Sequence, residues 1–117
     1  MGIPDNTHKA SADAVAALGN WVGVFTGDAG TTGANEATGG GYARKQTTFA
    51  TGSMSGGLWV RTGSQVTIPV AAGTYEQGGY FSAETSGSFV GSDNFAGGSV
   101  TVSGTGASIL LTPSVQA

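Results

Sequence analysis

The stretch GDAGTTGANEATGGGYARK, residues 27–45, is an irregular loop that runs into an extended segment. Its first part is rich in Gly, Thr and Ala, and its Gly, Asp and Asn residues favour turns over regular structure. Residues 42–51, YARKQTTFAT, then show the alternation of side chains that is typical of a strand. Outward from this stretch, short β-branched or aromatic runs are separated by Gly, Ser, Asn and Asp, so most of the chain is predicted to be β-structure.

Eight short strands are predicted from this pattern. They cover residues 21–26, 42–51, 57–62, 65–70, 77–83, 88–91, 99–103 and 107–112. Only one helical pattern is present, so no helix is available to connect parallel strands. The predicted fold class is therefore all-β, a β-sandwich or a jelly-roll-like arrangement, with a short N-terminal α-helix.

The N-terminal helix is predicted over residues 7–18, with Asp5 or Asn6 as its N-cap and Gly19 directly after its end. Small apolar residues recur at helical spacing, and we expect them to form the side of the helix that packs. This predicted stripe consists of Ala10, Ala14, Ala17 and Leu18.

The length of 117 residues indicates one folding unit, with residues 1–20 as an N-terminal arm and helix and residues 21–117 as a single β-sandwich domain. The chain has 22 Gly and no Cys, which excludes disulfides and thiolate chemistry. No stretch approaches the about 20 apolar residues of a membrane span, and residues 1–10 lack the features of a signal peptide. We therefore expect a protein with no membrane partner.

Charge is scarce in this chain. Only 9% of residues are charged and the net charge is −3, against about 25% charged residues in an ordinary domain. The four cationic residues are too few to neutralise a track of phosphates, so direct binding of nucleic acid is not expected. A surface of Ser, Thr, Gly and Ala is consistent with contacts to neighbouring subunits, although low sequence complexity alone would also produce it.

Glycine positions predict the turns. Residues 61–64 and 84–87 are each predicted to be hairpin connections in which Gly supplies a positive φ. Gly78 and Gly79 interrupt an otherwise regular strand. They predict either a β-bulge or the close approach of another backbone.

No catalytic residue, cofactor or metal site is predicted. His8 is the only histidine and has no accompanying nucleophile motif, and the carboxylates are dispersed along the chain. Asp28, Asn35 and Glu36 share one loop and could bind calcium, but the EF-hand spacing is absent. The alternative is that these polar side chains cap the turns of their own loop.

Aromatic residues leave one further binding hypothesis open. A sugar-binding face could be built from Trp21, Trp59, Tyr75 and Tyr80. Aromatic residues at strand spacing more often belong to the core, so the sequence does not separate the two interpretations.

Several motifs resemble those of small structural proteins of tailed bacteriophages, which are labelled tail fibre or minor capsid proteins. The resemblance is carried by TTGANE (residues 31–36), YAR (42–44), PVAAGT (69–74), the aromatic pair at 80–81 and the Gly pair at 97–98. It extends from about residue 21 to the C-terminus. It implies a structural protein of the virion, assembled in the cytoplasm of the bacterial host.

The expected function is a non-enzymatic one in the virion. The chain is short and has no repeat of a fibre shaft, so a minor capsid or decoration protein is predicted, which stabilises the shell by binding major capsid subunits and copies of itself. The alternative is a tail-fibre or tail-associated protein that binds a host-surface glycan. The residues predicted to lie at an interface are Arg44, Lys45, Trp59, Arg61, Gly78 and Gly79.

Overall fold

The computed structural model describes residues 2–117, which form one helix and eleven short strands in antiparallel sheets. The elements are α1 (Asp5–Leu18), β1 (Trp21–Phe25), β2 (Lys45–Gln46), β3 (Ser53–Ser55), β4 (Leu58–Thr62), β5 (Val66–Pro69), β6 (Gly73–Tyr75), β7 (Gln77–Phe81), β8 (Phe89–Asn94), β9 (Val100–Val102), β10 (Ser108–Leu111) and β11 (Ser114–Gln116). Among the described residues no sheet closes into a barrel. The predicted all-β, sandwich-like class with an N-terminal helix is confirmed.

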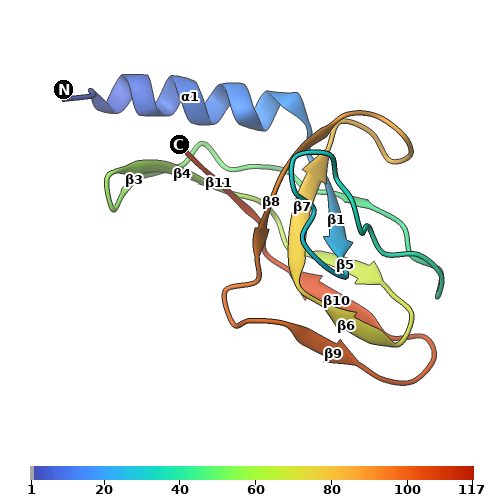
Figure 1. The fold of residues 1–117 in the computed structure, drawn as a ribbon. Helices are drawn as coiled ribbons and strands as arrows, with labels where there is room; N and C mark the ends of the chain where they lie inside the picture. The colour runs from blue at the N-terminus through green and yellow to red at the C-terminus, as the bar shows by residue number, and fades with distance from the viewer. Residues whose placement is uncertain (1) are drawn as a thin grey trace.

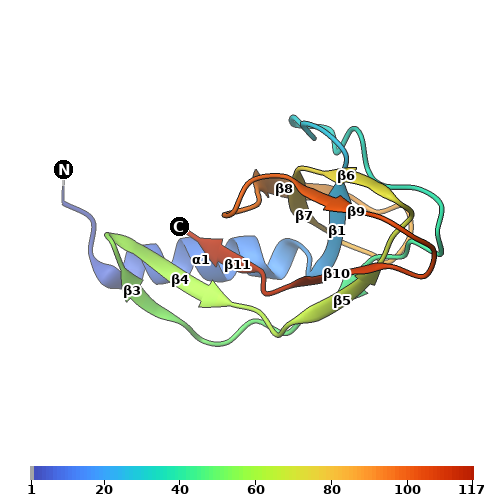
Figure 2. The same cartoon turned by 90° about the horizontal axis from the view of Figure 1, so that it is seen from below.

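The sheets are joined by a long two-stranded ribbon. Strands β4 and β5 are consecutive in the chain and run in the same direction, so that together they form one side of the ribbon. They pair with β11 and β10 respectively, which form the other side. The four-stranded sheet β2-β1-β7-β8 lies at one end of this ribbon, while α1 lies along β4 and β11 at the other (Figures 1 and 2). The molecule is therefore elongated, with principal dimensions of 48 × 28 × 24 Å.

The main core lies between the four-stranded sheet and the ribbon. Val22 and Val24 point from β1 toward the ribbon, where Ile68 of β5 and Ile109 of β10 meet them, and all four side chains are buried. The alternation along β1 places Phe25 on the opposite face of the sheet, in a second cluster with Ala29 and Phe81. The four-stranded sheet is thus buried on both faces.

The helix packs through a different face from the one predicted. Ala12 is fully buried, whereas Ala10, Ala14, Ala17 and Leu18 are exposed, so the predicted packing stripe was wrong. The helix lies along β4 and β11, where the small side chain of Ala12 allows close approach, and Asp13 beside it pairs with Arg61 of β4, with 3.2 Å between the carboxylate and the guanidinium. In the described part of the chain, no helix is long and apolar enough to cross a membrane.

The helix also begins earlier than predicted. Its first residue is Asp5, and Pro4 occupies the N-cap position with no side-chain cap. The carbonyl of Pro4 accepts hydrogen bonds from the backbone N–H groups of Thr7 and His8 at 3.0 and 3.2 Å. Gly19 follows the end of the helix in an extended conformation. A Cβ there would collide with the carbonyl of Phe81, so close packing requires glycine at this position.

The orientation of the helix can be tested with two matched substitutions. Ala12→Leu adds volume where no space exists and is expected to lower the free energy of unfolding by about 1–3 kcal/mol. Ala14→Leu adds the same volume on the exposed face and should change it by less than about 0.5 kcal/mol. Urea unfolding of both variants measures the difference, and equal effects would contradict the observed rotation.

Residues 42–51 do not form one strand as predicted, because they divide between two sheets. Only β2 pairs with β1, through the registers Trp21–Gln46 and Val22–Lys45. The chain then crosses to β4, where the backbone N–H of Ala50 donates to the carbonyl of Thr62 at 2.8 Å. One segment thus connects the four-stranded sheet to the end of the molecule that carries the helix.

One of the two predicted hairpins is wrong. Residues 61–64 continue the ribbon, and the N–H of Gly63 donates to the carbonyl of Pro113 at 2.7 Å. Strands β4 and β5 therefore pair with the distant C-terminal strands and not with each other. The predicted hairpin at residues 84–87 is confirmed, since it joins the paired strands β7 and β8.

A hairpin that the sequence analysis missed joins β3 to β4. Gly56 and Gly57 form its two-residue turn with φ values of 59° and 83°, which L-residues with side chains adopt at a cost. Strand β3 is only three residues long and consists of Ser, Met and Ser, so it lacks the β-branched residues that mark a strand.

Gly78 and Gly79 do not form the bulge that was one of their two predicted roles. The irregularity in the pairing of β7 and β8 lies one step further on, between Tyr80 and Phe81, where Val90 is the extra residue on β8. The other predicted role, a close backbone approach, is seen within the chain: a Cβ on Gly79 would lie 2.6 Å from the carbonyl oxygen of Gly91.

Candidate functional site

The loop with the TTGANE and YAR motifs forms one hydrogen-bonded cluster, which we call the Glu36 cluster (Glu36, Tyr42 and Arg44). The Arg44 guanidinium binds the Glu36 carboxylate through two parallel hydrogen bonds, Nε to Oε2 and Nη2 to Oε1, both of 2.8 Å. The Tyr42 hydroxyl donates to Oε2 of Glu36 at 2.7 Å. This bidentate geometry is the strong form of an ion pair.

Arg44 also fastens the hairpin between β7 and β8 to this loop. Its Nη1 donates to the carbonyl oxygens of Ala83 at 3.0 Å and Ser86 at 2.7 Å. The guanidinium carbon lies 3.4 Å from the centre of the Phe81 ring, which is a close cation–π contact. One side chain therefore connects the loop, the hairpin and the aromatic face of the four-stranded sheet.

A glycine of the sheet makes room for the cluster. Gly23 of β1 and Gly79 of β7 are directly paired. A Cβ on Gly23 would lie 2.7 Å from the Tyr42 hydroxyl and 3.2 Å from Oε2 of Glu36. The absence of a side chain at Gly23 thus lets the polar cluster lie directly on the backbone of the sheet.

The ionisation of Glu36 depends on its two partners. Burial works to raise the pKa of Glu36, but the hydrogen bonds from Arg44 and Tyr42, with the charge of Arg44, outweigh burial and hold that pKa below its ordinary value. Burial first, and then the hydrogen bond to Glu36, raise the pKa of the Tyr42 hydroxyl far above its ordinary value. The cluster therefore stays a carboxylate, a neutral phenol and a guanidinium across the neutral pH range.

The lowered pKa predicts acid sensitivity. A depressed pKa contributes stability above the ordinary Glu value of about 4.3, and this stability is lost as the pH falls through the folded-state pKa. Urea unfolding below pH 4 should show a falling free energy of unfolding, and Glu36→Gln should weaken that dependence. The exposed Glu84 provides a control, because Glu84→Gln is expected to leave the dependence unchanged. An unaltered slope in Glu36→Gln would contradict the assignment.

The Glu36 cluster stabilises the loop and offers little for chemistry. Four of the five N–H groups of Arg44 already have acceptors, and no buried side-chain nitrogen or oxygen in residues 2–117 lacks a partner. A depression of about 300 Å³ beside the cluster is lined by Glu36, Tyr42, Arg44 and the hairpin. The polar groups of Glu36, Tyr42 and Arg44 are occupied with one another and with the backbone of the hairpin.

The loop does not assemble the calcium ligands that were considered. Glu36 is bound to Arg44, while Oδ1 of Asp28 accepts from the N–H of Gly30 at 2.9 Å. The Asn35 amide donates to the carbonyl of Asp28 at 2.9 Å. Across residues 2–117 no group of three or more His, Asp or Glu side chains is placed to bind a metal. These side chains cap and fasten their own loop, which was the other interpretation.

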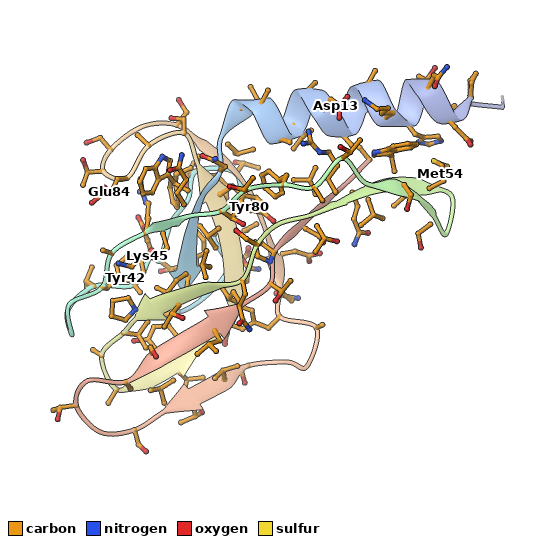
Figure 3. The ribbon with its side chains drawn as sticks, turned by 180° about the vertical axis from the view of Figure 1, so that it is seen from behind. Asp13, Tyr42, Lys45, Met54, Tyr80 and Glu84 are labelled. Atoms are coloured by element: carbon orange, nitrogen blue, oxygen red, sulfur yellow. The ribbon has the colours of Figure 1, made fainter. Side chains whose placement is uncertain are left out.

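The residues predicted to lie at an interface occupy different surroundings. Lys45 is exposed on β2, close to Tyr42 (Figure 3). Arg61 is bound to Asp13 and to the carbonyl of Ala50, and the indole N–H of Trp59 donates to the carbonyl of Thr51 at 2.9 Å. Arg44 and Gly79 take part in packing within the chain, as described above. For the whole set, contact with a partner stays a prediction.

The four aromatic residues considered for sugar binding do not gather on one surface. Trp21 packs against the aromatic cluster on β1, and Tyr75 is buried in the main core with its hydroxyl donating to the carbonyl of Ala71. The Tyr80 hydroxyl donates to the carbonyl of Ser114 at 2.7 Å, and burial raises its pKa. Trp59 lies at the far end of the molecule, beside the helix. This arrangement favours a structural role for these residues.

The cluster itself was not predicted, although part of it can be read from the sequence. In an extended segment Tyr42 and Arg44 project to the same side, because side chains alternate. A carboxylate upstream of the TGGG turn was therefore a candidate partner for Arg44. What the sequence lacks is any indication that the chain reverses so as to bring Glu36, and not Glu84, to Arg44.

Comparison with known proteins identifies the family. A family model described as podophage GP4 fiber I protein gp80 matches residues 6–111, which extend from the first turn of α1 to the end of β10. No curated protein and no solved structure matches the chain. The match agrees with the expected relation to phage structural proteins of the tail-fibre type. Since it covers most of the chain, this protein belongs to the podophage GP4 fiber I protein gp80 family.

Proposed function

We propose that this protein is a non-enzymatic subunit of a phage tail fibre and is carried in the virion. The observation that carries the proposal is the family match over residues 6–111, because the family is named for a fibre protein. The role of a minor capsid or decoration protein, which was the main prediction from the sequence, is less well supported, since the chain is related to a fibre family. The fibre role was the second of the two functions considered from the sequence.

The geometry is compatible with a structural role. The most strongly bound charged groups of the chain, in the Glu36 cluster, hold a loop and a hairpin on the sheet. The Gly, Ser and Thr residues of the β6–β9 pair and its connections are largely exposed (Figure 1). The aromatic residues that could bind sugar are dispersed, so the proposal does not include a glycan site.

Location in the particle tests the proposal. Purified virions would be labelled with Fab fragments against this chain and imaged, and mass spectrometry would count its copies relative to the major capsid protein. Labelling confined to the tail, with few copies for each particle, is expected. Labelling over the whole shell with hundreds of copies would instead establish the capsid role, and absence from virions would overturn both.

A further inference from the structure

The four-stranded sheet ends in two strands that have no neighbour on their outer side. Its order is β2-β1-β7-β8, so among the described residues β2 and β8 each pair with only one strand. An edge strand presents backbone N–H and C=O groups to which another strand can bind. Proteins that do not use such an edge for assembly usually protect it.

The edge formed by β8 is open and lies beside an apolar groove. The groove has a volume of about 740 Å³, and Tyr80, Ile109 and Leu111 are among the residues that line it. Gly91 and Asp93 of β8 also line it, and no atom lies within 4 Å of the position that a Cβ on Gly91 would take. The face of β8 at Gly91 is therefore uncovered where it borders the groove, with the acidic side chain of Asp93 at the rim.

The edge formed by β2 carries the opposite charge. Lys9, Arg44 and Arg61 all form ion pairs, which leaves Lys45 as the one cationic side chain without an ion pair in residues 2–117. Lys45 is exposed, as is Asp93. One edge of the sheet therefore presents an unpaired positive charge, and the other presents a negative charge.

The register places these two charges on the same face of the sheet. Lys45 pairs with Val22, Val22 with Tyr80, and Tyr80 with Gly91, so all four share one face. Asp93 follows Gly91 by two residues and projects to that same face. Strands β2 and β8 also run in opposite directions, because three antiparallel pairings separate them. A second copy in the same orientation would thus bring β2 antiparallel to β8.

We propose that the chain assembles head to tail, with β2 of one copy adding to β8 of the next and Lys45 lying opposite Asp93. The partner is a second copy of this chain, selected by charge complementarity across the two edges. Such a contact uses two different surfaces, so repeated contacts produce a ring or a filament. The biological purpose of this assembly rests on the proposed fibre function. The association itself is a property of the isolated chain, so it can be disproved whatever the location of the protein in the virion.

Disulfide trapping tests the geometry, because the chain has no native Cys. Lys45→Cys and Asp93→Cys variants of the full chain would be mixed under mild oxidation. Within one copy the two positions are separated by three strand spacings and by two residues along the strand, roughly 16 Å in all, which is too far for a disulfide. A disulfide between the two variants is expected. Each variant alone should form much less dimer, because the contact does not bring a position against itself, and equal yields would overturn the proposal.

Charge reversal tests the complementarity. Lys45→Glu and Asp93→Lys should each weaken self-association by roughly 2- to 30-fold per contact, since attraction becomes repulsion, and the double variant should restore it. Glu84→Lys makes the same charge change as Asp93→Lys at the hairpin (Figure 3) and serves as the control. Sedimentation velocity measures the association. A wild-type chain that stays monomeric, or a double variant that is not restored, would overturn the proposal.

Discussion

Replacing Gly79 with alanine is expected to lower the free energy of unfolding by about 3 kcal/mol, a large fraction of the roughly 5–15 kcal/mol that stabilises a folded domain. A Cβ at this position would lie 2.6 Å from the carbonyl oxygen of Gly91 and 2.9 Å from a ring carbon of Phe25. The first neighbour is backbone in the paired strand β8 and the second is a fully buried ring, so neither can move away cheaply. Urea or thermal unfolding measures the loss.

Gly91→Ala is the matched control for this prediction. Gly91 lies on the neighbouring strand and a Cβ there meets no atom within 4 Å, so its replacement should cost less than about 1 kcal/mol. Similar losses for the two variants would show that glycine flexibility, and not close packing, explains the effect. Any failure of Gly79 variants to enter virions should therefore be interpreted only after their folding has been measured.

Replacing Arg44 with alanine is expected to cost about 3 kcal/mol. The change leaves the Glu36 carboxylate without its bidentate partner and removes the donor to the carbonyls of Ala83 and Ser86. The side chains of Arg44 and Glu36 are 9% and 22% exposed, so water compensates only in part. The loss should appear in urea unfolding, together with faster amide exchange in residues 82–88, which the side chain fastens to the loop.

Two further variants separate this effect from loss of charge alone. Lys9→Ala removes an exposed ion pair with Asp13 and should cost less than about 1 kcal/mol. Arg44→Lys keeps the charge but cannot reproduce the planar, bidentate contact, so it should recover only a small part of the stability. Full recovery by lysine would contradict the role assigned to the guanidinium geometry.

Most of the strands could be predicted because their information is local. The alternation at residues 21–26, 77–83 and 107–112 follows from the two-residue period of a strand, and the observed elements lie within those ranges. The three-residue strands β3, β6 and β11 were missed, whereas the equally short β9 was predicted because all three of its residues are β-branched. The family resemblance was also local, since it depends on motifs that can be read directly.

Local patterns could not predict which strands pair with one another or which face of the helix is buried. The helix was located from its own residues, but the side that is buried depends on β4 and β11, against which it packs and which lie far along the chain. In the sequence, residues 61–64 look like a hairpin connection. In the folded chain, however, β4 and β5 pair with the C-terminal strands and not with each other. In both cases the deciding contact is made by residues distant in the sequence.

The Glu36 cluster depends both on local sequence patterns and on packing between distant segments. The sequence by itself determined an all-β chain with one N-terminal helix and its phage-type motifs, because propensity, alternation and turns act over a few residues. Only the tertiary structure decided that Glu36 meets Arg44, that Gly23 lies beneath the cluster, and that Lys45 and Asp93 mark opposite edges of one sheet. These depend on how separate segments pack, which no local pattern contains.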